Sequence, residues 1–207
     1  MTTLSINDFT TETTSHAPGR IMPQKAGNAL WRPMFVMALM AFAVGFVLAI
    51  VRANMISNGD DPLQIAAFGQ YIPAAMFVGF ASIFAAISFA IAKILGEFRV
   101  GGGSVQEAVG GDVKTLKMPG TAKAFIALMA MAMMVILAAV VLHVVAGVSI
   151  AAGDWSAVKA EQWTIWLEAA RRFGVVLYLF SITFGLVTIA KVIRFQTFRL
   201  RQVAHTE

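Results

Sequence analysis

The chain has 207 residues, of which 58% are hydrophobic and 13% are charged. Soluble globular domains carry about 25% charged residues, so this composition excludes an ordinary soluble domain. The sequence contains no cysteine, which excludes disulfide bonds and thiolate metal ligands. The formal net charge is +5, and whether it indicates nucleic acid or a membrane depends on where the basic residues lie.

Four stretches of the chain contain no charged side chain. A helix needs roughly 20 apolar residues to cross a bilayer, and each stretch is close to or beyond that length. We therefore predict an all-α integral membrane protein with four transmembrane helices in a bundle. The stretches are Pro33–Val51, Pro62–Ala92, Ala124–Gly153 and Phe173–Ala190. The predicted spans are about 33–53, 72–95, 122–151 and 172–194.

The spans divide the chain into a membrane domain and two tails. Residues 1–30 begin with a Thr- and Ser-rich segment, and we predict a flexible cytoplasmic tail. Residues 31–200 form the predicted transmembrane domain, and residues 201–207 form a cytoplasmic C-terminal tail.

The segment from Arg99 to Lys123 is the only substantial loop predicted on the cytoplasmic side of the membrane. Gly101–Gly103 opens it, and glycine favours irregular backbone. Ser104 and Glu107 have the spacing of a capping box, which predicts a short helix within the loop.

A short interfacial helix is predicted before the fourth span. Ser156 is a suitable N-cap, and Trp163 and Trp166 recur at helical spacing opposite Lys159 and Glu168. Tryptophan is enriched at the membrane–water interface. The predicted interfacial anchors are Trp31, Trp155, Trp163 and Trp166.

The basic residues alternate between the two sides of the predicted membrane. Twelve of the 16 Lys and Arg lie in the two tails and the middle loop, and four lie in the other two segments. The positive-inside rule then places both termini in the cytoplasm. We predict a bacterial cytoplasmic (inner) membrane location with contacts to anionic inner-leaflet lipid. Because topology explains the basic excess, we predict no nucleic-acid partner.

Small residues recur every four positions on each predicted span. In lipid, such stripes allow close approach of two helices, so they mark packing faces. The predicted helix-packing residues are Ala41, Gly45, Ala49, Ser82, Ala86, Ala139, Gly147, Tyr178, Ser181 and Gly185.

His143 is the only ionisable residue well inside a predicted span. An intramembrane polar residue is a functional hypothesis by default. His143 could contact a haem or a quinone, or it could be a packing residue that hydrogen-bonds a hydroxyl on the fourth span. The candidate hydroxyls are those of Tyr178, Ser181 and Thr183. His16 and His205 lie in the tails, so the chain supplies no second intramembrane histidine for a bis-histidine haem.

The predicted function follows by elimination. All Asp and Glu lie outside the uncharged stretches, which disfavours an ion carrier, and one buried histidine is too little for an enzyme or a metal site. We therefore expect a non-catalytic accessory subunit of a respiratory, photosynthetic or oxygenase-type membrane complex. Its expected partners are other integral membrane subunits and lipid, with no soluble substrate. The alternatives are a haem- or quinone-contacting subunit centred on His143, and a membrane sensor acting through the 99–123 loop.

Overall fold

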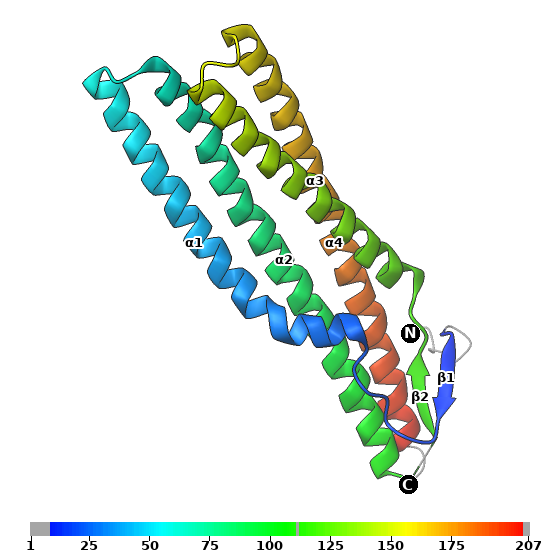
Figure 1. Cartoon of the computed structure of the whole chain (residues 1–207). Helices are drawn as coiled ribbons and strands as arrows, with labels where there is room; N and C mark the ends of the chain where they lie inside the picture. Colours follow the sequence, from blue (N-terminus) through cyan, green and yellow to red (C-terminus); the bar gives the residue numbers. More distant parts are fainter. Residues whose placement is uncertain (1–8, 111, 205–207) are drawn as a thin grey trace. The chain divides into compact units, whose positions relative to one another are not determined.

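The computed structural model describes residues 9–110 and 112–204. Four long helices account for most of the chain (Figure 1), and each is apolar and long enough to cross a membrane. The prediction of four apolar spanning helices is confirmed, and the chain is a multi-pass membrane protein by helix length and hydropathy. The helices are α1 (Met22–Asn58), α2 (Pro62–Ala108), α3 (Gly120–Ala151) and α4 (Ala157–Ala204).

The helix ends follow from local sequence. Asp61 precedes α2, and its Oδ1 accepts the backbone N–H of Leu63 at 3.0 Å. Ser156 caps α4 as predicted, because its Oγ accepts the N–H of Lys159 at 3.3 Å. Gly59, with φ of +68°, follows the last residue of α1 in the left-handed conformation that glycine adopts at helix ends.

The chain forms two compact units, and each long helix contributes a segment to both. Unit 1 comprises the described residues of Met1–Trp31, Ile87–Ala127 and Phe180–Glu207. Unit 2 comprises Arg32–Ala86 and Leu128–Leu179.

The core of unit 2 is built around Tyr178. Its ring stacks on Phe84 with ring centroids 5.3 Å apart, and its hydroxyl donates to the Met133 sulfur at 3.3 Å. Ala132 and Ile136 of α3 are completely buried in the same cluster. Small alanines beside a large ring let α2, α3 and α4 pack closely.

Within unit 2, the α1 segment buries few side chains and contacts α2. A Cβ at Gly45 would lie 2.7 Å from the Met76 sulfur, so the Met76 side chain lies directly against the α1 backbone at this glycine. Phe42 packs edge-on against Phe80, with ring centroids 5.1 Å apart. Most large side chains of α1 point outwards and remain exposed.

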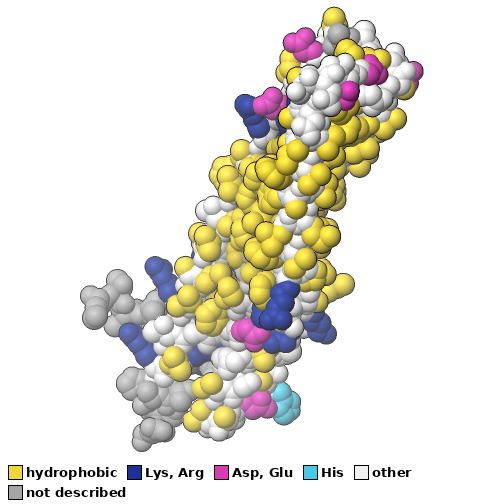
Figure 2. All heavy atoms as spheres, turned by 90° about the vertical axis from the view of Figure 1, so that its left-hand side faces the viewer, with side chains coloured by type: hydrophobic (Ala, Val, Ile, Leu, Met, Phe, Trp, Pro, Cys, Tyr) yellow, Lys and Arg dark blue, Asp and Glu magenta, His cyan; other side chains and the backbone are white. Residues whose placement is uncertain are grey.

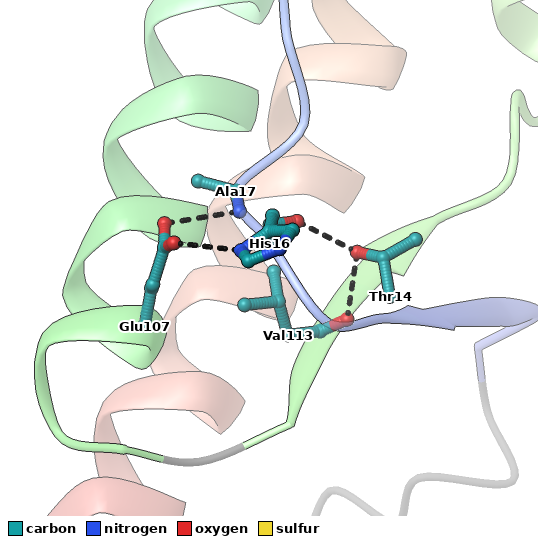
Figure 3. A network of polar contacts seen from close by, with 5 residues as sticks. All are labelled: Thr14, His16, Ala17, Glu107 and Val113. Carbon is teal, nitrogen blue, oxygen red and sulfur yellow. Dashed lines mark hydrogen bonds and ion pairs between the residues drawn. The ribbon is translucent and has the colours of Figure 1, made fainter.

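Unit 1 contains a two-stranded antiparallel sheet that the sequence did not predict. Strand β1 (Thr11–Thr14) pairs with β2 (Val113–Leu116), and Figure 1 shows them side by side. The Glu107 carboxylate accepts the backbone N–H of Ala17 at 3.1 Å and lies 3.2 Å from the His16 ring (Figure 3). These contacts connect the chain after β1 to the end of α2.

The described part of the predicted N-terminal tail therefore carries regular structure. Besides β1, helix α1 begins at Met22, eleven residues before the predicted span. Residues 1–8 of that tail, and 205–207 of the C-terminal tail, lie outside the described residues. The domain division remains a prediction.

Two local predictions are wrong. The glycine-rich segment Gly101–Gly103 is helical, because α2 continues to Ala108. Ser104 is consequently an interior helical residue whose hydroxyl donates to the Val100 carbonyl at 3.1 Å, and it caps nothing. Residues 157–170 form no separate interfacial helix, because they are the first turns of the continuous helix α4.

Hydrophobic side chains cover much of the helical surface seen in Figure 2. In a soluble protein such a surface would drive aggregation. In a multi-pass membrane protein it faces lipid or a neighbouring subunit.

Candidate functional site

Three polar side chains from three helices form a hydrogen-bonded chain in unit 2, with two of them buried and Thr164 half-buried. His143 on α3 is 1% exposed, and its Nδ1 lies 2.8 Å from Oε1 of Gln70 on α2. The Gln70 amide donates to the Thr164 hydroxyl on α4 at 2.7 Å. Thr164 in turn donates to the carbonyl of Ala160, one turn earlier, at 2.9 Å.

The direction of these hydrogen bonds determines the state of the imidazole. Because the Thr164 proton is used on Ala160, its oxygen must accept from the Gln70 amide nitrogen. The Gln70 oxygen then faces His143, so Nδ1 must carry the proton. A neutral histidine in this tautomer presents a bare lone pair on Nε2. That atom is buried and has no hydrogen-bond partner.

A neighbouring close contact positions α2 against α3. Gly147 lies one turn after His143, and a Cβ there would overlap the ring of Tyr71. Glycine lets the Tyr71 ring lie against the α3 backbone, which brings the adjacent Gln70 within reach of His143.

The predicted partners of His143 were wrong. Tyr178 donates to Met133, and the Ser181 hydroxyl donates to the Phe125 carbonyl at 2.9 Å. The printed sequence places Gln70 inside an uncharged stretch but before the predicted span. The structure places it within α2, where it is 5% exposed. The side-chain amide of Gln70, a polar group inside an uncharged stretch, was the signal in the sequence that could have indicated a partner for His143.

Arg171 is a second buried polar residue of unit 2, although in the sequence it falls among the charged residues outside the predicted spans. It is 9% exposed, and its Nε is buried without a hydrogen-bond partner. Its guanidinium lies 4.4 Å from the ring centre of Phe77. Stacking on an aromatic face offsets part of the cost of removing the cation from water.

The predicted packing residues lie mostly in the interior. Ala41 is half-buried, and Ala49 is exposed. Their roles in packing remain predictions. The buried ones are Gly45, Ser82, Ala86, Ala139, Gly147, Tyr178, Ser181 and Gly185.

The four predicted tryptophan anchors have different surroundings. Trp31 is half-buried, and the ammonium of Lys93 lies 5.3 Å from its ring centre. Trp155 and Trp163 pack with ring centroids 5.4 Å apart. Trp166 is 75% exposed. A membrane-anchoring role for these rings remains a prediction.

Neither a search for metal-binding groups nor a comparison with known proteins assigns a further role to these residues. Within residues 9–110 and 112–204, no group of three or more His, Asp or Glu side chains is placed to hold a metal ion. No protein-family model, curated protein or solved structure matches this chain. The functional argument therefore rests on the residues themselves.

Proposed function

We propose that this chain is a non-catalytic accessory subunit that stabilises a larger membrane complex by lateral helix packing. The surface of α1 is the observation that supports this proposal. Among the described residues 32–58, α1 buries only Ala38 and Gly45. Ala49 and Ala53 continue the small-residue stripe of Gly45 but are exposed. Such a stripe allows close approach of a helix from another subunit.

Large apolar side chains flank this stripe and would complete the contact. Large apolar side chains pack equally well against lipid, so they do not by themselves indicate a protein neighbour. A row of alanines offers lipid no such contact, but it lets a second helix approach closely. The combination therefore favours a protein neighbour on this face of α1. The exposed side chains beside the stripe include Phe35, Met37 and Phe46.

The test is purification in a mild detergent, followed by mass spectrometry of the attached subunits. Ala49→Leu adds bulk to the stripe, so the amount of partner subunit that copurifies should fall several-fold. Ala43→Leu makes the same change at another exposed position of α1, about 160° around the helix from Gly45. It should leave the complex intact. Recovery of the parent chain as a lone monomer would overturn the proposal.

We also propose that both termini face the cytoplasm of a bacterial inner membrane, as the distribution of basic residues favours. Because the chain has no cysteine, single cysteines report the sidedness cleanly. A membrane-impermeant maleimide should label Ser57→Cys in intact cells and should label Thr13→Cys only after lysis. The reverse pattern would contradict the orientation.

A contact between His143 and a haem or quinone is the second candidate function. The unpaired lone pair on the buried Nε2 favours it, because a haem iron or the hydroxyl of a reduced quinone would satisfy that atom. Purified protein should then show a haem absorbance band or contain extractable quinone. His143→Ala should lose the cofactor, and His16→Ala, which alters an exposed histidine, should keep it. Cofactor-free parent protein would reject this candidate.

A further inference from the structure

A cavity of about 100 Å³ lies within unit 1, between segments of α1, α2, α3, α4 and the chain around β2. This volume is several times what one water molecule requires, which is about 10–15 Å³ by the same measure. Most of the wall is apolar. It includes Ile21, Leu95, Leu116, Met118, Phe125 and Phe195.

Two arginines line the same cavity, Arg99 from α2 and Arg199 from α4. Arg199 is 3% exposed, and the Nε atoms of both are buried without hydrogen-bond partners. The Arg199 guanidinium lies 4.6 Å from the ring centre of Phe195. The two cations act on each other as like charges. Among the described residues, neither forms an ion pair with Asp or Glu.

This arrangement is costly without an anion. Removing the Arg199 cation from water costs free energy that no ion pair among the described residues offsets, and the like charge of half-buried Arg99 adds repulsion. A phosphate would remove both costs, since guanidinium groups bind its oxygens in bidentate fashion. The apolar wall beside the cations is unsuited to a fully hydrated ion but suits an anion attached to an apolar group.

The position of the arginines along their helices fits a lipid headgroup. Arg99 lies seven residues beyond Ala92, and Arg199 nine beyond Ala190, where the uncharged stretches end. At about 1.5 Å per residue these offsets are about 10 and 14 Å. Helical side chains lean towards the N-terminus of their helix, so both arginines lean back towards the uncharged stretches and the headgroup layer.

We propose that this cavity binds an anionic phospholipid, with its phosphate on Arg99 and Arg199 and its adjoining apolar part against the cavity wall. The site is independent of the accessory-subunit proposal. It would connect α2 and α4 through the bound phosphate.

The test measures thermal unfolding of the delipidated full chain in detergent. Phosphatidylglycerol should raise the Tm by several degrees, more than phosphatidylcholine with the same acyl chains. Arg99→Gln and Arg199→Gln should each lose most of this increase. Arg201→Gln removes an equal charge from an exposed position of α4 and should retain it. Arg199→Lys, which keeps the cation, should keep part of the response.

Native mass spectrometry supplies a second measurement that does not depend on the folding of Arg199→Gln. Parent protein should retain phosphatidylglycerol, and Arg99→Gln should retain several-fold less. Equal lipid responses in the parent and both Gln variants would overturn the site. An equal Tm increase from inorganic phosphate would also overturn the lipid assignment, because the apolar wall would then contribute nothing.

Discussion

Two buried polar regions, one in each unit, are built on opposite principles. In unit 2, Gln70, His143 and Thr164 satisfy one another in a neutral chain that leaves only Nε2 unpaired. In unit 1, Arg99 and Arg199 carry like charges into an apolar cavity with no acidic partner among the described residues. The comparison separates polar groups that satisfy one another within the interior from cations for which we propose an anionic ligand.

Energetics distinguish the two cases. A hydrogen-bonded neutral chain contributes modestly when intact, and breaking it leaves its remaining members unsatisfied. Unpaired like charges destabilise the unliganded protein, and their removal relieves that cost. Mutation should therefore lower stability in the first region and leave it unchanged or raise it in the second.

The largest expected effect is in the neutral chain. Gln70→Leu leaves the Nδ1–H of His143 and the Thr164 hydroxyl without their partner, which should cost about 1–2 kcal/mol in stability. Thermal unfolding in detergent measures the loss. Gln64→Leu makes the same substitution at an exposed position of α2 and should be close to neutral. Equal stability of both variants would show that the chain of bonds contributes nothing.

A double substitution sharpens this result. Replacing both hydrogen-bonding groups by apolar ones can be nearly neutral, because no buried donor is left alone. Gln70→Leu combined with His143→Leu should therefore be less destabilised than the sum of the single variants. A double-mutant cycle measured by thermal unfolding gives this coupling. Strict additivity would mean that the two side chains do not interact.

The sequence predicted the helices well but not their ends. A sufficiently long stretch without charged residues identifies a membrane span, because charged groups are costly in lipid. It does not show where a helix stops in water. Helix α2 continues through Gly103, which lies against Pro18, and the first turns of α1 pack through Gly27 against Ala92 of α2. Gly102 is enclosed by Gln196 and Arg199, a contact between α2 and α4 that no local pattern of residues predicts.

The candidate sites were predictable only in part. His143 was singled out because an ionisable residue inside a span is rare. Its partner Gln70 was missed because it is uncharged and lies at the start of a long apolar run. Arg99 and Arg199 are 100 residues apart, and the positive-inside rule alone accounts for the basic residues of both segments. Their common cavity is a tertiary property.

A variant of the charged region should behave oppositely to Gln70→Leu. Arg99→Gln removes one of two repelling cations, so in lipid-free detergent its Tm should equal or slightly exceed that of the parent. The same thermal scan measures it, with Arg201→Gln as the charge-matched control. A clear loss of stability without lipid would mean that Arg99 has a satisfied structural role, and the contrast between the two regions would disappear.

The smallest expected effect lies outside both regions, at the exposed contact of Glu107 with Ala17 and His16. Glu107→Gln still accepts the Ala17 N–H but loses its charge, and exposed ion pairs contribute little. We expect an unchanged Tm and slightly faster amide hydrogen exchange at Ala17. Glu97→Gln, which removes the exposed ion pair with Arg20, is the matched control. A loss of Tm as large as that of Gln70→Leu would mean that burial does not decide how much each polar contact contributes to stability.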